Sequence, residues 1–432
     1  MYNGVLQVKK YITKAKSVLF SGTAKDTYVL FLGNLDSAFL GFLFTFFIAR
    51  ALDRADFGIF SAALNLVVIL SSLSDIGITT GLVNFIAEAD AKGDENKSLE
   101  FQKAGFLIRV AIVLTLSILV IVFAPYISKN MLATTDPVVA IWTSLISLFL
   151  FIPMYFPFVL QATKQFLKSV IVDNIYYLFR LIGLLGFIYF GTISLYSAFS
   201  TAFLGFGASI IASFMFLKFK FLFSKPKKEI YTRLLKFSGW IGVNRIVSSI
   251  SGRLDIQMLA SISGASVTAL YSIPSRLASF IIILTSSFSS VLAPRFAGFQ
   301  DKESEKKYLI KASFALIPII LATVLWVILA KPFMSIIFPN YMDSVPVFQA
   351  LTLSMIPFIL TAPSVSAILY AMKKNIYIGA YSFFQIAAIF LLNYYFIPKY
   401  GALGPTITYG ITNTILAIYT WAIVIKYYWY EK

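Results

Sequence analysis

Long stretches without a charged residue constrain this chain more than any other feature. Residues 137–163 and 181–217 are two of them. A helix needs about 20 apolar residues to cross a bilayer, so 181–217 has room for two crossings, separated at Gly191-Thr192. A backbone in lipid must satisfy its own hydrogen bonds, which leaves helix bundles and closed barrels. Barrel strands show about ten residues of alternating polarity, and these continuous apolar runs exclude them.

The sequence predicts an all-α integral membrane fold of about twelve transmembrane helices. Hydrophobic residues make up 59% of the chain and charged residues 13%, whereas about a quarter of the residues in soluble domains are charged. The predicted spans are residues 28–50, 57–83, 104–124, 138–162, 170–190, 195–217, 237–260, 266–292, 312–330, 344–371, 376–397 and 402–425.

Basic residues outside these spans predict the orientation. With the N-terminus in the cytoplasm, 26 lysines and arginines fall on the cytoplasmic side and five on the outer side. Cytoplasmic loops ordinarily carry this excess, so both termini are predicted to be cytoplasmic. The net charge of +17 is therefore mainly a topology signal and an attraction to anionic lipid, and we expect no nucleic-acid partner.

The spans divide the chain into two predicted lobes. Residues 1–27 have apolar side chains at helical spacing among five lysines, which predicts an amphipathic helix on the cytoplasmic surface or, alternatively, a disordered basic tail. Residues 28–217 form the N-terminal six-helix lobe and 237–425 the C-terminal one. The basic stretch 218–236 is a cytoplasmic linker, and 426–432 is a cytoplasmic tail.

The two halves repeat each other weakly. At an offset of 204 to 211 residues, Phe57-Gly-Ile-Phe-Ser61 matches Thr268-Ala-Leu-Tyr-Ser272, and Ile152-Pro-Met154 matches Ile356-Pro-Phe358. Because each half has an even number of spans, such a repeat implies a pseudo-two-fold axis along the membrane normal, with a substrate between the lobes.

No catalytic set emerges from the sequence. Cysteine and histidine are both absent, which removes thiol catalysis, disulfides and ordinary zinc sites. The chain also lacks a Gly-Lys-Ser loop for nucleotide phosphates. We therefore expect a transporter without catalytic residues, metal or cofactor.

One N-terminal motif is familiar. The stretch Ile48-Ala-Arg-Ala-Leu-Asp-Arg-Ala-Asp-Phe-Gly-Ile-Phe-Ser61, together with Asp75-Ile-Gly77 and Gly81-Leu-Val-Asn-Phe-Ile-Ala-Glu88, resembles polysaccharide-unit flippases, the exporters of O-antigen, capsule and exopolysaccharide repeat units. Their superfamily also contains multidrug-and-toxin extruders and lipid II flippases. Two features depart from these patterns: Asn84 stands where such flippases often have arginine, and the first span has Ala38 and Phe44 where lipid II flippases carry arginines.

The resemblance implies a function. Such a protein moves undecaprenyl-(di)phosphate-linked oligosaccharides from the cytoplasmic to the outer leaflet of the bacterial inner membrane. Two lobes around a central cavity would open alternately to each side. A polysaccharide polymerase and glycosyltransferases would be partners.

The predicted spans contain arginine but no lysine. All 27 lysines lie in loops, whereas five of nine arginines lie inside spans. Guanidinium binds phosphate through two parallel hydrogen bonds, so we predict Arg276, Arg253, Arg245 and Arg180 as substrate-phosphate ligands. The fifth, Arg109, is the weakest candidate; Arg109 and Arg245 could alternatively extend to the cytoplasmic surface.

Other polar residues in the spans suggest a wet cavity and an ion site. Helical spacing groups Asn244 and Ser248 on span seven, and Ser272 and Ser279 beside Arg276 on span eight; these are predicted to line the cavity. Asp36, with Asn34 nearby, and Asp255 are candidates for coupling transport to H⁺ or Na⁺. Alternatively, Asp255 neutralises Arg253 or Arg276, and Asp173 is the partner of Arg180.

Two other functions fit the same predicted fold. A multidrug or cation antiporter would need a cavity rich in carboxylates and aromatic residues, and the five arginines argue against it. A non-transporting scaffold for glycan-assembly enzymes would need no hydrated cavity.

Overall fold

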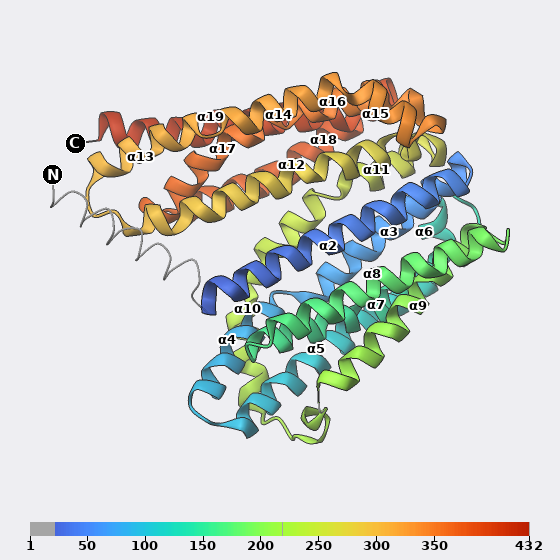
Figure 1. The fold of residues 1–432 in the computed structure, drawn as a ribbon, viewed down its shortest axis with the longest axis horizontal. Helices are drawn as coiled ribbons and strands as arrows, with labels where there is room; N and C mark the ends of the chain where they lie inside the picture. Colours follow the sequence, from blue (N-terminus) through green and yellow to red (C-terminus); the bar gives the residue numbers. More distant parts are fainter. Residues whose placement is uncertain (1–21, 218, 432) are drawn as a thin grey trace, which may run out of the picture. The chain divides into compact units, whose positions relative to one another are not determined.

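The computed structural model describes residues 22–217 and 219–431, and it contains helices but no strand within those ranges (Figure 1). The predicted N-terminal amphipathic helix lies mostly outside the described residues. The longer helices are α2 (Gly22–Ala51), α3 (Arg54–Asp75), α4 (Ile78–Ala91), α5 (Glu95–Val122), α7 (Pro137–Ala162), α8 (Phe166–Tyr189), α9 (Leu195–Phe216), α10 (Lys228–Ser251), α12 (Ala265–Gly298), α13 (Lys302–Phe314), α14 (Ile317–Ile328), α18 (Asn375–Tyr400) and α19 (Leu403–Ile425).

Shorter helices join or extend these. They are α6 (Ala124–Met131), α11 (Leu254–Ser263), α15 (Ala330–Ile337), α16 (Val345–Ser354), α17 (Ile356–Ser366), the 3-10 turns Lys220–Phe223 and Pro339–Ser344, and the π-helical turns Ala367–Ala371 and Lys426–Tyr430. Eleven helical stretches in the described part of the chain are long and apolar enough to cross a membrane. The predicted all-α membrane fold is confirmed.

The predicted seventh span, residues 237–260, is not one continuous helix. The structure has α10, which begins at Lys228 within the predicted linker, and then α11, with a break at Gly252 and Arg253. Neither helix is among the eleven stretches apolar enough to cross a membrane. Because α10 begins with charged residues and Gly252 weakens the helix, the sequence pattern alone overestimated the continuity of this span.

The predicted second span, residues 57–83, is also broken. Helix α3 ends at Ile76 (φ 39°), and α4 begins after Gly77 (φ 72°), so two consecutive residues have left-handed backbone. Glycine adopts this conformation without strain, whereas isoleucine does not. The chain therefore changes direction at residues 76–77.

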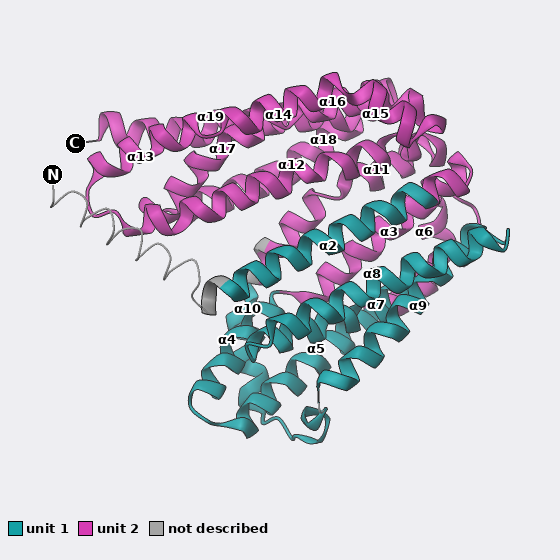
Figure 2. Cartoon of the chain, viewed as in Figure 1, with its two compact units in different colours: residues 1–47, 77–115, 146–239 teal, residues 48–76, 116–145, 240–432 magenta. Residues whose placement is uncertain are grey.

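Contacts divide the chain into two compact units, coloured in Figure 2. Unit 1 contains residues 1–47, 77–115 and 146–239, and unit 2 contains residues 48–76, 116–145 and 240–432. Their boundaries differ from those of the predicted lobes, because several helices contribute to both units. The division into six-helix halves stays a prediction from the sequence.

Each unit has its own apolar core. In unit 1, Phe85, Phe101 and Tyr155 belong to a cluster that also includes Phe221, a residue of the predicted linker. Lys103 donates to the carbonyls of Leu222 (2.8 Å) and Ser224 (2.6 Å). This part of the linker is therefore packed against α5.

The core of unit 2 is built around α12. This helix packs against α3, α11, α16 and α17, and α18 packs against α19. Tyr271 and Ile359 are buried in its largest cluster. A second cluster includes Phe296 of α12 and Tyr428 of the π-helical turn that follows α19.

Candidate functional site

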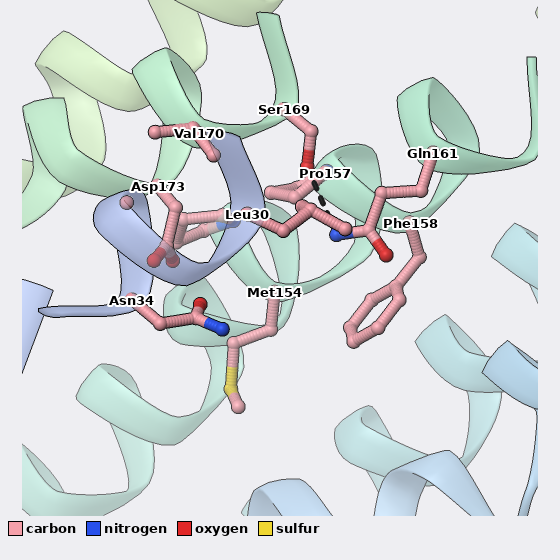
Figure 3. A pocket seen from close by; sticks show the side chains of 11 residues that line it. Leu30, Asn34, Met154, Pro157, Phe158, Gln161, Ser169, Val170 and Asp173 are labelled. Carbon is pink, nitrogen blue, oxygen red and sulfur yellow. Dashed lines mark hydrogen bonds between the residues drawn. The ribbon is translucent and has the colours of Figure 1, made fainter. Parts of the chain in front are cut away.

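A cavity of about 180 Å³ lies within unit 1, between α2, α7 and α8 (Figure 3). Its polar lining residues are Asn34 on α2, Gln161 on α7, and Ser169 and Asp173 on α8. Apolar lining comes from Leu30, Gly33, Pro153, Met154, Pro157, Phe158 and Val170. Four polar side chains thus meet in a space that is otherwise apolar.

Three lining residues shape the backbone around the cavity. Pro153 and Pro157 lie inside α7, and each removes a backbone N–H and bends the helix. Gly33 lets α2 approach α8 closely, because a Cβ at this position would lie 2.4 Å from Cγ1 of Val170. The cavity therefore lies where α7 is bent and α2 and α8 touch.

Hydrogen bonds join α2 to the polar part of α8. The Ser37 hydroxyl lies 2.9 Å from Oδ2 of Asp173 and within hydrogen-bonding reach of Oδ1 of Asn174. Asp173 makes no ion pair with a described residue. A carboxylate inside a membrane helix is unfavourable unless it takes up a proton or pairs with a cation, so Asp173 has the chemistry of a monovalent-cation or proton site.

Helices α7 and α8 contribute a second polar pair. Nε2 of Gln161 donates to Oγ of Ser169 over 3.0 Å, the contact dashed in Figure 3. This bond joins the end of α7 to the start of α8. The remaining oxygen of the Gln161 amide is an additional acceptor for a ligand in the cavity.

The two ion-coupling candidates on α2 are placed differently. Asn34 lines the cavity, whereas Asp36 is exposed, does not line it, and has no hydrogen bond or ion pair with a described residue. Residues two apart do not share a helix face. The structure thus brings Asn34, Ser37 and Asp173 together and leaves Asp36 apart.

Arg180 is held by aromatic side chains of unit 1. Its guanidinium carbon lies 4.0 Å from the ring centroid of Phe44 on α2, and Nη1 lies 3.5 Å from the Tyr176 hydroxyl. A guanidinium over an aromatic face is stabilised electrostatically. Arg180 is half-buried and does not line the cavity.

Arg109 is enclosed in unit 1. It is 2% exposed, and its guanidinium carbon lies 5.8 Å from the ring centroids of both Phe151 and Tyr155. Nη1 also lies 3.5 Å from the Thr79 hydroxyl. The interpretation that Arg109 extends to the cytoplasmic surface is therefore wrong.

Arg245 forms an ion pair in unit 2. Its Nη1 contacts Oδ2 of Asp75, the last residue of α3, and so ties α10 to the α3–α4 break. The sequence analysis did not predict this pair. With a carboxylate already bound, Arg245 is a weaker candidate for a substrate phosphate.

Asp255 is buried in unit 2 at the start of α11. The Tyr271 hydroxyl donates to its Oδ2 over 2.6 Å, and its Oδ1 is buried without a hydrogen bond in the described chain. No ion pair joins Asp255 to a described residue. Arg253 nevertheless interacts electrostatically with Asp255, so the alternative that Asp255 neutralises Arg253 or Arg276 stays a prediction.

The other predicted site residues of unit 2 differ in how far they are buried. Arg253 is the N-cap residue of α11, without a capping bond from its side chain, and is half-buried, as is Arg276 on α12. Ser272 is fully buried and donates to its own helix at Thr268, over 2.8 Å, so it does not reach an open cavity here. Exposed positions are Ser248 and Ser279; the side chain of Asn244 lies outside the described part.

Sequence patterns missed Ser37, Gln161 and Ser169. Ser37 follows Asn34 by three residues, a spacing that places both on one helix face, so this signal was present. Gln161 and Ser169 lie on either side of a loop, and only the return of the chain after Ala162 brings them together. Helical spacing within single spans contains no such information.

A family of known proteins matches more than half of the chain, including every residue that lines the cavity. The family described as "Polysaccharide biosynthesis protein" matches residues 23–300. A protein of Shigella flexneri, named as an O-antigen transporter, is 24% identical over 186 residues. That match covers 42% of this chain and 44% of the relative, so the chain matches less than half of the relative's length.

Solved structures of transporters have the same fold. An inward-facing multidrug resistance transporter of the multidrug-and-toxin-extrusion family aligns with a TM-score of 0.75 and 14% identity, covering 90% of this chain and 94% of the other. The lipid II flippase MurJ, in an inward closed conformation, aligns with a TM-score of 0.73 and 18% identity, covering 92% and 87%. At these identities the likeness establishes the fold alone.

Proposed function

The chain belongs to the polysaccharide biosynthesis protein family, and we propose that it is a flippase for undecaprenyl-(di)phosphate-linked oligosaccharides. The family match over residues 23–300 is the observation that carries this proposal. The lipid-linked unit would move from the cytoplasmic to the outer leaflet of the bacterial inner membrane. Both termini would lie in the cytoplasm, as the distribution of basic residues predicts.

Arginine is the residue type suited to this substrate. A phosphate crossing hydrocarbon needs hydrogen-bond donors in place of water, and guanidinium supplies two in a fixed geometry. Of the arginines inside spans, Arg109 is enclosed by aromatic rings and Arg245 is paired with Asp75. Arg276, Arg253 and Arg180 stay the phosphate candidates that the sequence predicts, and Arg276, which has the exposed Ser279 one turn further along α12, is the first to test.

The unit 1 cavity supports coupling to an ion gradient. Asp173 lies seven residues after Phe166, the first residue of α8, which is about 10 Å along the helix. Uptake of H⁺ or Na⁺ there would relieve an unpaired carboxylate and change the contact between α2 and α8 through Ser37. Asp255, whose Oδ1 is buried without a hydrogen bond in the described chain, is a second candidate for the same role in unit 2.

The multidrug antiporter remains the rival hypothesis, because a multidrug transporter shares this fold with a TM-score of 0.75. The two hypotheses differ in the charge of the substrate. An anionic lipid-linked sugar needs the arginines, whereas a cationic drug would be repelled by them. Arg276 is therefore the residue at which the two functions can be separated.

The test is glycan export in cells that depend on this gene. Arg276→Lys should lower surface glycan and Arg276→Ala should lower it further, with normal protein in the membrane, because a point charge cannot reproduce the two-pronged phosphate contact. Arg295→Ala, which removes an arginine from the end of α12 instead, is the matched control. Wild-type glycan with both Arg276 variants, together with changed drug resistance, would favour the antiporter.

A further inference from the structure

The end of the chain is fastened to unit 2 by aromatic side chains. The π-helical turn Lys426–Tyr430 follows α19, and Figure 1 shows it beside the start of α13. Tyr428 is buried, and its hydroxyl donates to Oε2 of Glu305 on α13 over 2.8 Å. Tyr428 belongs to an apolar cluster with Phe296 and Val424, so the turn is packed against the core of unit 2.

Three lysines converge on the rings of this turn. Nζ of Lys302 lies 4.3 Å from the ring centroid of Tyr427, and Nζ of Lys374 lies 5.5 Å from the same centroid. Nζ of Lys306 lies 4.2 Å from the Trp429 ring. We call these five residues the C-terminal collar.

Three carboxylates at the start of α13 are engaged elsewhere, and the Glu431 carbonyl accepts from Nζ of Lys302 over 3.4 Å. Asp301 accepts from the Ser304 backbone N–H at the start of α13, and Glu303 pairs with Lys307. Glu305 accepts from Tyr428. Within the described chain, none of the three collar lysines forms an ion pair with a carboxylate.

We propose that the C-terminal collar binds the headgroups of anionic phospholipids. A lysine over an aromatic face is held in position. Because an ammonium has three N–H donors, even Lys302, which donates to the Glu431 carbonyl, can also donate to a phosphate. Trp429 is 45% exposed and Tyr430 79% exposed, and aromatic side chains of this kind favour the headgroup level of a bilayer. The proposed orientation places the site in the cytoplasmic leaflet, which carries anionic lipid.

A collar site differs from a general attraction of basic loops to the membrane. Lys225, Lys227 and Lys228 carry the same charge, are exposed, and have no aromatic ring beneath them in the described contacts. If only the amount of charge matters, the two lysine sets are equivalent. If the rings position the ammonium groups, the collar binds phospholipid more tightly.

Native mass spectrometry of the purified full-length protein, titrated with phosphatidylglycerol, tests this. Replacing Lys302, Lys306 and Lys374 by Gln should weaken binding of the first lipid by about a hundredfold, since each of the three lysines contributes about fivefold. The matched control replaces Lys225, Lys227 and Lys228 by Gln and should change it little. A second variant, Tyr427→Leu with Trp429→Leu, keeps the charges and should also weaken binding.

Three results would overturn the proposal. Equal weakening in the two lysine variants would reduce the effect to net charge. Full affinity without the two rings would remove the collar geometry from the explanation. Displacement of phosphatidylglycerol by equimolar undecaprenyl phosphate would assign the site to the transported lipid. Loss of glycan export alone would bear on the proposed flippase function and not on lipid binding.

Discussion

Asp173 is a carboxylate that lines the unit 1 cavity without an ion-pair partner among the described residues. It has a hydroxyl and an amide nearby, through Ser37 and Asn174, but no basic partner among described residues. Inside a membrane helix such a group is stable when it is protonated or when it binds a cation. Its charge can therefore change with the ion gradient, which is the requirement for coupling.

Asp173→Asn should remove the gradient dependence of transport, because an amide cannot take up a proton or hold a cation by charge. The measurement is export rate with and without a collapsed H⁺ or Na⁺ gradient. Asp36→Asn is the matched variant on α2, and Asp36 itself is a predicted coupling residue. A larger loss with Asp36→Asn than with Asp173→Asn would move the coupling site out of the cavity.

At the residue scale, the sequence could not predict which way each polar side chain points or which partner it meets. As polar residues of the first predicted span, Asn34 and Asp36 were equal candidates, but only the packing of α2 against α8 places Asn34 in the cavity and Asp36 outside it. For Arg245 the sequence supplied the charge and not its partner. Asp75 lies 170 residues earlier in the chain, so no local spacing connects them.

At the scale of elements, the contact between α2 and α8 shapes the cavity. Gly33 faces Val170 so closely that any side chain must displace it. Gly41, on the same helix, has nothing within 4 Å of an added Cβ. The two glycines therefore separate the effect of close packing from that of helix propensity.

Gly33→Ala should lower thermal stability in detergent, since overpacking costs about 1–3 kcal/mol. Gly41→Ala should be neutral or stabilising, because alanine favours a helix by up to about 1 kcal/mol over glycine. Adding Val170→Ala to Gly33→Ala removes both clashing methyl groups and should recover most of the loss. Equal melting temperatures for Gly33→Ala and Gly41→Ala would contradict the packing described here.

The sequence predicted helices well and their interruptions poorly. Apolar runs reported length and polarity, so the spans are recognisable in eleven helical stretches of the described chain. The breaks at Ile76-Gly77 and Gly252-Arg253 depend on backbone angles that hydropathy does not encode. Glycine occurs at both breaks and also in continuous helices, as at Gly41, so its presence alone was not decisive.

At the scale of the whole molecule, orientation in the membrane rests on the distribution of basic residues. Reporter fusions after Lys129 and after Lys225 should report the outer side and the cytoplasm respectively. Lys129 lies in α6, and Lys225 in the packed linker before α10. The same side for both positions would contradict the predicted order of spans.

The central claim is that this chain moves a lipid-linked sugar across a bilayer, and reconstitution tests it most directly. Purified protein in liposomes would be given an undecaprenyl-diphosphate-linked oligosaccharide, and the fraction reaching the opposite leaflet would be measured over time under an imposed H⁺ or Na⁺ gradient. The account predicts protein-dependent, gradient-dependent movement that slows with Arg276→Ala. Movement of cationic drugs by the same liposomes, with the lipid-linked sugar left in its original leaflet, would contradict it.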